Sequence, residues 1–347
     1  MPPTIPGLAT LPVLPISEAL PQLQQSLAQH HELVLEAPPG AGKTTLVPLS
    51  LLSESWLTGQ RIIMLEPRRM AARAAAQRMA SLLNEEVGQT VGYRIRQESR
   101  ISSHTRIEVI TEGILTRMLA DDPLLEGVAL LIFDEFHERS MDADFGLALA
   151  LQSRELFRDA GMPLRLLVMS ATLDGDAVAS LLGDARLIRS AGKMHPVTVH
   201  YGQAKRLDDN IVECVLNALP GIIRKHSGSL LVFLPGQGEI NEVMQHLGGR
   251  LSPEESQEID ILPLYGALTL REQQRAIESM TAKRKVVLAT DIAETSLTIE
   301  GINVVVDAGL CRVPRFDPAT GMTRLLTRRI SKDSSVQRMG RAGRLAA

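Results

Sequence analysis

Aromatic residues and cysteine are both scarce in this sequence. Phe, Trp and Tyr together make up 3% of the chain, so its hydrophobic cores must be built from aliphatic side chains. The two cysteines, Cys214 and Cys311, lie far apart, and neither stands in a Cys/His spacing typical of a metal site. We interpret both as reduced packing residues, which excludes a disulfide-stabilised secreted domain.

Long apolar runs are also missing. No segment approaches the roughly 18 apolar residues that a membrane span requires. Residues 1–16 are apolar, but they contain five prolines and no Lys or Arg, so we expect an irregular leader and not a signal peptide. The sequence therefore predicts a soluble protein, and a bacterial cytoplasm is its simplest compartment.

Positive charge is not in overall excess. The chain has 37 Lys and Arg against 40 Asp and Glu, a formal net charge of −3. A protein of this composition can bind nucleic acid only where positive charge is concentrated locally. One such segment runs from Arg312 to Arg344, with nine Lys or Arg and two Asp, a local charge of +7.

The 347 residues present suit two or three domains. Short Val/Ile/Leu-rich runs alternate with segments of helical composition such as 70–83 and 112–119. Runs that are apolar throughout are typical of parallel strands buried on both faces, and this alternation predicts parallel α/β sheets. The expected strands form two series, 33–35, 61–65, 106–110, 129–133 and 164–169, then 229–234, 259–264, 285–289 and 302–306.

The gap between the two series predicts a domain boundary. It falls within residues 190–200, where Gly192, His195 and Pro196 interrupt the pattern, so we expect domains at 1–192 and 193–347. Near the end of the chain, residues 311–329 resemble two short strands joined at Asp317-Pro318-Ala319-Thr320-Gly321. These turn-forming residues predict a hairpin.

The strongest local motif is Glu36-Ala37-Pro38-Pro39-Gly40-Ala41-Gly42-Lys43-Thr44-Thr45, which follows an expected strand and precedes an expected helix. This context is that of a P-loop, whose backbone N–H groups surround nucleotide phosphates. Residues 37–45 are therefore predicted to bind nucleotide. Lys43 is expected to reach the β- and γ-phosphates, and the Thr44 hydroxyl to contact Mg²⁺.

An acidic motif ends the expected strand 129–133. It reads Asp134-Glu135-Phe136-His137, followed by Glu138-Arg139-Ser140. An apolar strand that ends in two acids places carboxylates at the edge of a sheet where α/β proteins bind ligands. We expect Asp134 to hold Mg²⁺ and Glu135 to orient or deprotonate the attacking water.

Together these motifs resemble superfamily 2 helicases of the DEAH-box class. The third box residue is Phe136 where the class commonly has Ala, and the Asp134–Ser140 stretch is similar to the bacterial HrpB branch, as is Glu66-Pro67-Arg68-Arg69. The resemblance spans about residues 33–344. It implies two tandem RecA-like parallel-sheet domains with a cleft between them.

In the first domain the resemblance implies three further roles. Ser170-Ala171-Thr172 couples hydrolysis to domain movement. Arg68 and Arg69 contact phosphates of the nucleic acid, and the Thr111-Glu112-Gly113 motif contacts the strand through a hydroxyl and a backbone amide. A phosphate contact of this kind carries no sequence preference.

In the second domain the resemblance implies nucleic-acid contacts at Gly236, Gln237 and Thr290. Asp291 stands where the family commonly has Asn. The segment Gln337-Arg338-Met339-Gly340-Arg341-Ala342-Gly343-Arg344 resembles the last family motif. It implies that Gln337 faces the water and γ-phosphate and that Arg341 and Arg344 are arginine fingers, which we expect on one helix face because they lie three residues apart.

Base recognition is expected to be weak. The family holds adenine between an Arg and an aromatic residue, and the matching positions are Arg78 and Leu310, with Asp307 also at the nucleotide. Leu310 provides apolar contact without stacking, and no Gln-containing adenine motif precedes the P-loop. We therefore expect ATP to be used with Mg²⁺ and other NTPs to be accepted.

The sequence thus predicts an ATP-dependent helicase or translocase acting on single-stranded RNA or DNA. Two alternatives are a catalytically silent nucleic-acid-binding scaffold and another P-loop ATPase. The complete set of motif residues argues against the first, and a second α/β series with its own arginines argues against the second. Family members continue into accessory domains beyond this point, so we expect a fragment that holds the motor.

Overall fold

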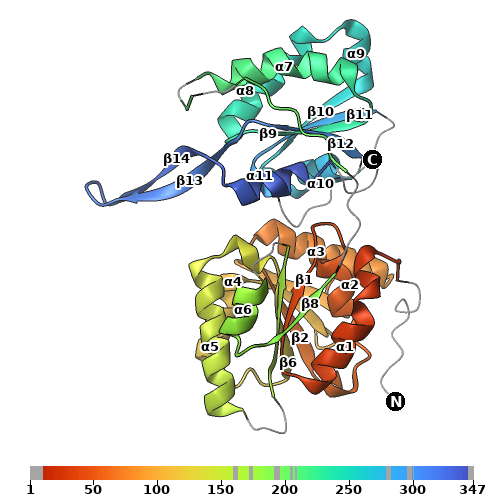
Figure 1. The fold of residues 1–347 in the computed structure, drawn as a ribbon, viewed down its shortest axis with the longest axis vertical. Helices are drawn as coiled ribbons and strands as arrows, with labels where there is room; N and C mark the ends of the chain where they lie inside the picture. The colour runs from red at the N-terminus through yellow and green to blue at the C-terminus, as the bar shows by residue number, and fades with distance from the viewer. Residues whose placement is uncertain are drawn as a thin grey trace. The chain divides into compact units, whose positions relative to one another are not determined.

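The computed structural model describes residues 11–158, 163–171, 175–190, 196–203, 206–207, 209–278, 283–294, 299 and 301–342. The chain divides into two compact units, residues 1–193 and 194–347. Each unit has its own sheet with helices packed on it (Figure 1). Among the helices in these ranges, none is both long and apolar enough to cross a bilayer.

Unit 1 is built on a sheet in the order β4-β3-β5-β2-β6-β7-β1-β8. All neighbouring strands are parallel except β3 and β4. The strands are β1 Glu32–Glu36, β2 Arg61–Glu66, β3 Val91–Ile95, β4 Glu98–Arg100, β5 Ile107–Thr111, β6 Val128–Phe133, β7 Arg165–Ser170 and β8 Arg186–Arg189. Because the central strands are parallel, their carboxyl ends meet at one edge of the sheet.

The five strands predicted for this unit are confirmed as β1, β2, β5, β6 and β7, but β3, β4 and β8 were not predicted. These three lie at or near the sheet edges, and they are interrupted by polar or small residues instead of being uniformly apolar. The glycine in β3, Gly92, is required by the close approach of β4. A Cβ there would lie 2.4 Å from the carbonyl oxygen of Arg100, so only glycine allows β4 to fold back.

Helices cover both faces of this sheet (Figure 1). Leu33 and Leu35 of β1 face one core and Val34 faces the other, as the two-residue period of a strand requires. One core packs against the first three helices, which are α1 Leu20–Gln29, α2 Lys43–Ser50 and α3 Arg69–Leu82. The other packs against α4 Glu112–Asp121, α5 Met141–Phe157 and α6 Gly175–Leu181.

The prediction of an irregular leader is wrong at its end. Pro15–Glu18 forms the short 3₁₀ helix η2, and Ile16 is fully buried in the first core. The Ile16 backbone N–H donates to the Ala41 carbonyl, and a Cβ at Gly42 would lie 2.6 Å from the Leu14 side chain. This segment therefore packs on the P-loop. Apolar residues among prolines gave no periodic pattern that could predict it.

Unit 2 has a smaller parallel sheet in the order β10-β11-β9-β12. Its strands are β9 Ser229–Phe233, β10 Ile259–Leu264, β11 Arg284–Ala289 and β12 Ile302–Asp307, which confirms the second predicted series. Its helices are α7 Ile211–Lys225, α8 Gln237–Leu247, α9 Pro253–Glu258, α10 Leu270–Ile277 and α11 Lys332–Met339. Short 3₁₀ segments elsewhere are η3 Ser55–Leu57, η4 Phe136–Glu138, η5 Gly248–Arg250 and η6 Asp291–Ala293.

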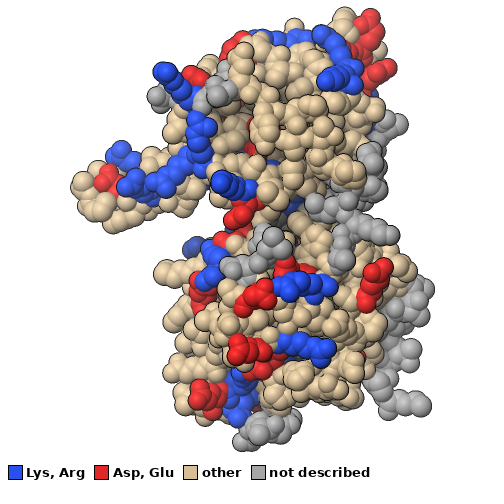
Figure 2. Space-filling view, in the orientation of Figure 1, with Lys and Arg blue, Asp and Glu red and all other residues tan. Residues whose placement is uncertain are grey.

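The predicted hairpin is confirmed as β13 Leu310–Asp317 and β14 Met322–Arg329. Asp317 organises its turn, because its carboxylate accepts hydrogen bonds from the Ala319 N–H and the Thr320 hydroxyl. The hairpin extends away from the sheet of unit 2, and arginines gather along it (Figures 1 and 2). Every residue of β14 is exposed, so its arginines are open to solvent.

Candidate functional site

The P-loop connects β1 directly to α2. Gly40 and Gly42 have φ values of 81° and 94°, in the left-handed region that favours glycine. Lys43 is the first residue of α2, so Thr44 and Thr45 lie in its first turn, where backbone N–H groups attract anions. The predicted strand–loop–helix context is therefore present.

The acidic box begins where β6 ends, beside the end of β2. The Asp134 backbone N–H donates to the Leu65 carbonyl at 3.1 Å, which continues the ladder between these strands. Glu135 then has a φ of 51° and a ψ of 33°, a left-handed conformation that is unfavourable for a residue with a Cβ. The turn directs both carboxylates toward the P-loop.

Lys43 bridges the two motifs. Its Nζ lies 2.7 Å from Glu135 Oε1 and 3.3 Å from Asp134 Oδ1, and all three side chains are buried. Burial alone would lower the pKa of Lys43, but the Asp134 and Glu135 carboxylates raise it above its ordinary value. Lys43 therefore carries a positive charge at neutral pH, at the point where the P-loop meets α2.

Thr44 and Asp134 form an oxygen-rich pair beside Lys43. The Thr44 hydroxyl donates to Asp134 Oδ2 at 2.5 Å, so one hydroxyl and one carboxylate oxygen lie in contact. Mg²⁺ is bound in nucleotide sites by one or two such oxygens together with phosphates and water. The donor set fits the metal that the sequence predicts.

A third buried acid, Glu66, was not singled out from the sequence. It ends β2, which neighbours β6, and its side chain is fully buried. Burial, together with repulsion from Asp134 and Glu135, raises the pKa of Glu66 well above its usual range. The available signal was an acid at the end of an apolar strand, but the neighbouring Arg68 and Arg69 favoured a nucleic-acid interpretation, and the pairing of β2 with β6 does not follow from the sequence.

His137 ties the box to the next motif. Its Nδ1 accepts a hydrogen bond from the Ala171 N–H at 3.2 Å, and its Nε2 lies 3.5 Å from Glu135 Oε2. Burial lowers the pKa of His137 below its ordinary value, so the ring is neutral near pH 7. Ser170 ends β7 and is buried, while Thr172 lies outside the described residues.

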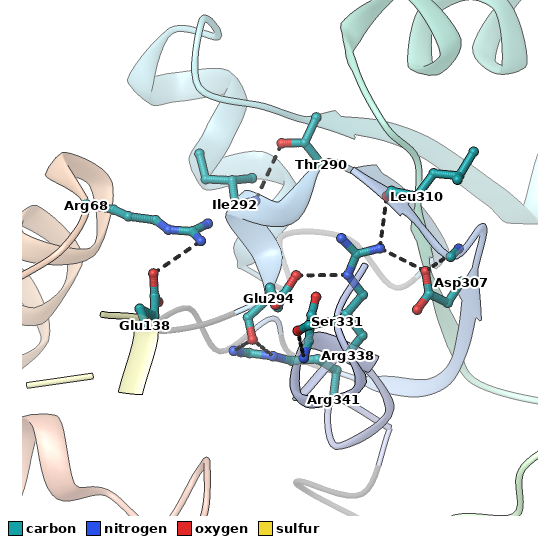
Figure 3. Close-up of polar contacts among 12 residues, drawn as sticks. Arg68, Glu138, Thr290, Ile292, Glu294, Asp307, Leu310, Ser331, Arg338 and Arg341 are labelled. Atoms are coloured by element: carbon teal, nitrogen blue, oxygen red, sulfur yellow. Dashed lines mark hydrogen bonds and ion pairs between the residues drawn. The ribbon is translucent and has the colours of Figure 1, made fainter. Parts of the chain in front are cut away.

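The predicted nucleic-acid contacts of unit 1 follow the carboxyl ends of β2 and β5. Arg68 is the N-cap of α3 and Arg69 its exposed first residue. Thr111 is the N-cap of α4, and Gly113 is exposed in its first turn. Arg68 Nη2 lies 3.3 Å from Glu138 Oε2, so the loop after β2 contacts the end of the box (Figure 3).

A buried arginine organises the predicted site of unit 2. Arg338 on α11 is 1% exposed, and its Nε donates to Glu294 Oε2 at 2.9 Å (Figure 3). Its Nη1 donates to Asp307 Oδ1 at 2.8 Å, and its guanidinium carbon lies 4.7 Å from the centre of the Phe233 ring. Arg338 was not predicted to be a site residue, although it lies beside Gln337 in the last motif.

The prediction that Arg341 lies on the helix is wrong. α11 ends at Met339, and the Arg341 N–H bonds back to the Arg338 carbonyl in a tight turn. Arg341 is buried and donates from Nε to the Glu294 carbonyl at 2.9 Å. Arg344 lies outside the described residues, and Gln337 is buried on α11.

The remaining predicted contacts of unit 2 lie at strand ends. Thr290 follows β11, and Gln237 donates to the Tyr265 hydroxyl at 3.2 Å. The guanidinium of Arg312 covers Gly236, where a Cβ would lie 2.8 Å from Nη1. Leu310 is buried and its carbonyl accepts from Arg338 at 3.3 Å.

Two family models match the chain in tandem. A DEAD/DEAH box helicase model matches residues 17–181, and a helicase conserved C-terminal domain model matches residues 211–346. The chain belongs to the DEAD/DEAH-box helicase family. The predicted fold of two RecA-like domains is thereby confirmed as well.

Relatives extend the family assignment. An ATP-dependent RNA helicase HrpB of Escherichia coli (strain K12) is 50% identical over 336 residues, 96% of this chain and 40% of the relative. The human ATP-dependent RNA helicase DHX33 is 36% identical over 345 residues, 95% of this chain and 47% of the relative. The chain thus spans less than half the length of these relatives.

A solved structure agrees. The crystal structure of the E. coli DEAH/RHA helicase HrpB superposes with a TM-score of 0.85 at 49% identity, covering 96% of this chain and 42% of that one. Four residues predicted for the nucleotide site lie together in unit 1. They are Lys43, Thr44, Asp134 and Glu135. Arg78 lies exposed on α3, and its role at the base stays a prediction.

Proposed function

We propose that this chain is an ATP-driven motor that hydrolyses nucleoside triphosphates and uses them to move along single-stranded RNA. The observation that carries the proposal is the buried contact of Lys43 with Asp134 and Glu135 at the P-loop. The relatives named as ATP-dependent RNA helicases support RNA as the track. The domain assignment proposed is nucleotide binding by residues 1–192 and completion of the site by residues 193–347.

The chemistry follows from the contacts of Lys43. A triphosphate that enters the P-loop replaces Glu135 as a partner of Lys43, because phosphate carries more negative charge than one carboxylate. Glu135 is then available to orient a water molecule and accept its proton while the water oxygen attacks the γ-phosphorus. The bond from that phosphorus to the β–γ bridging oxygen breaks, which yields a nucleoside diphosphate and phosphate.

Mg²⁺, held by Thr44 and Asp134, would neutralise charge on the β- and γ-phosphates. The protein supplies the remaining positive charge. Lys43 is fixed by the first turn of α2, and we assign Gln337, Arg341 and Arg344 to the γ-phosphate. The Arg341 guanidinium is already ordered, because its Nε and Nη2 both donate to the Glu294 carbonyl.

Nucleic-acid binding is assigned to the loops after β2 and β5 and to strand ends of unit 2. These places present arginine, hydroxyl and backbone N–H donors, which recognise phosphate without reading bases. The residues are Arg68, Arg69, Thr111, Gly113, Gly236, Gln237 and Thr290. The exposed arginines of the hairpin add local positive charge to unit 2.

The proposal is tested by phosphate release with four tracks. The chain is assayed with ATP and Mg²⁺ alone, then with single-stranded RNA, single-stranded DNA, and duplexes carrying either overhang. We expect hydrolysis that single-stranded RNA stimulates more than DNA. Equal stimulation by RNA and DNA would mean that the chain moves along either nucleic acid. Hydrolysis that no nucleic acid changes would refute the proposed motor function.

A further inference from the structure

The segment Glu138–Ser140, which follows the acidic box, contacts both loops that we assign to nucleic acid. Glu138 Oε2 lies 3.3 Å from Arg68 Nη2 after β2. The Ser140 hydroxyl donates to Glu112 Oε2 at 2.5 Å, at the start of α4 after β5. One short segment therefore joins the box to both sets of contacts, entirely within unit 1.

The same segment is bonded to the backbone of Glu135. The Glu138 N–H donates to the Glu135 carbonyl at 2.9 Å, and the Arg139 N–H donates to the Phe136 carbonyl at 3.2 Å. A displacement of Glu138 therefore acts directly on the peptide of the residue that we assign to the water. Only the 3₁₀ turn Phe136–Glu138 separates Glu135 from the residue that contacts Arg68.

The turn is also strained at both ends. Glu135 has a φ of 51° and Arg139 a φ of 43°, and neither is glycine. Such conformations are unfavourable for residues with a Cβ, and they persist only while neighbouring contacts hold them. The geometry of the turn therefore depends on the contacts of Glu138 and Arg139.

The Arg68–Glu138 pair is suited to exchange. Its 3.3 Å contact is longer than the roughly 2.7–2.9 Å of a strong charge-assisted hydrogen bond, and the two side chains are 28% and 19% exposed. Glu138 Oε1 is buried and has no hydrogen-bond partner in the part of the chain that the structure describes. Arg68 is the N-cap residue of α3, whose first N–H groups attract an anion to the same place.

We propose that Glu138 is a positioning residue that couples nucleic-acid contact to hydrolysis. A nucleic-acid phosphate takes Arg68 away from Glu138, and the released Glu138 shifts the turn that holds Glu135. The inference rests on the proposed function, because it needs Arg68 to contact nucleic acid. Glu138 competes with the phosphate, and its removal therefore strengthens binding.

Glu138→Gln tests the proposal, because it keeps the shape and removes the charge. We expect tighter binding of a labelled single-stranded RNA, by up to about fivefold, the upper range for a partly exposed ion pair. Hydrolysis without RNA should rise by a similar factor while the RNA-stimulated maximum stays, so the stimulation ratio falls. Glu155→Gln, an exposed position on α5 with the same charge change, is the matched control.

The outcomes distinguish the coupling role of Glu138 from the proposed contact of Arg68 with nucleic acid. Weaker binding by Glu138→Gln, or binding and stimulation equal to Glu155→Gln, overturns the coupling role. Arg68→Gln should weaken binding, and adding Glu138→Gln to it should change nothing further. If Arg68→Gln binds RNA as wild type does, the proposed contact fails and the coupling fails with it. Glu138→Ala must move both readouts in the same direction as Glu138→Gln, so a folding defect in one variant does not decide the result.

Discussion

Lys43 differs from a lysine in a surface ion pair because it is buried. It is buried with two carboxylates, one of which we assign to metal and the other to water. Removing one partner from such a cluster leaves an uncompensated buried charge, which is costly. The three residues therefore act as a unit, and their substitutions are not additive.

The role of Glu135 makes a direct prediction. In Glu135→Gln the amide cannot accept a proton from water, so turnover should fall by roughly 100- to 10,000-fold, the range for loss of a general base. Nucleotide binding should remain, because Lys43 and the P-loop backbone are unchanged. Equilibrium binding of a fluorescent nucleotide and single-turnover hydrolysis measure the two effects. Substantial turnover by this variant would show that another group handles the water.

Leu310 predicts weak discrimination among bases. It has no aromatic face, and its buried side chain packs within unit 2. ATP, GTP, CTP and UTP should then be hydrolysed within roughly tenfold of one another in kcat/KM, a spread of about 1.4 kcal/mol. A side-by-side phosphate-release assay measures this. A strong preference for ATP would mean that base recognition comes from residues other than Arg78, Asp307 and Leu310.

Elements that bury apolar side chains on both faces were predictable from the sequence, whereas edges and turns were not. β6 is wholly apolar, and the acids that follow it could be placed at the sheet edge. β8 begins and ends with arginine at an edge, so it gave no such pattern. The end of α11 was missed because sequence spacing alone does not show that Gly340 leaves the helix, and this misplaced Arg341.

Long-range polar contacts were also beyond prediction. Arg338 meets Glu294 and Asp307, which lie 44 and 31 residues away in sequence. Only the order of strands β11, β9 and β12 brings these groups together. Similarly, Glu66 joins the acidic box because β2 neighbours β6, a pairing that the sequence does not state.

The contact between η4 and β7 predicts a pH dependence of stability. Burial places the pKa of His137 below its ordinary 6.5, so the unfolded chain binds a proton more readily than the folded one. The stability from the neutral ring is therefore present above pH 6.5 and is lost as the pH falls below it. His137→Asn keeps an acceptor for the Ala171 N–H and cannot titrate, so it should lose less stability on acidification.

Urea unfolding at about pH 7.5 and about pH 5.5 measures that difference. The only tryptophan, Trp56, lies in unit 1, so its fluorescence reports this unit separately. His104→Asn, at an exposed position of the same unit, is the control and should behave as wild type. An equal loss of stability in wild type and His137→Asn would contradict the neutral, buried ring.

At the scale of the whole molecule, the proposed nucleic-acid binding by a chain of net charge −3 requires local positive charge. Binding should then weaken with salt, with a log–log slope of about −0.7 per phosphate neutralised on a single strand. Arg69→Ala should weaken all sequences alike and flatten the slope by somewhat under one unit. Arg186→Ala is the control and should change neither the affinity nor the slope. Arg186 begins β8, so it lies at the amino ends of the parallel strands, away from the ends that carry the proposed site. Fluorescence anisotropy across a salt series measures both, and an Arg69→Ala effect confined to one sequence would refute a phosphate contact.

We propose that the P-loop of unit 1 hydrolyses nucleotide in response to single-stranded RNA. Steady-state phosphate release from ATP and Mg²⁺ by wild type and Lys43→Ala, each with and without single-stranded RNA, tests this proposal. We expect RNA-stimulated release by wild type and only background release by Lys43→Ala under both conditions, because the phosphates lose their fixed cation. Release by Lys43→Ala equal to wild type, or wild-type release at background in the presence of RNA, would contradict it.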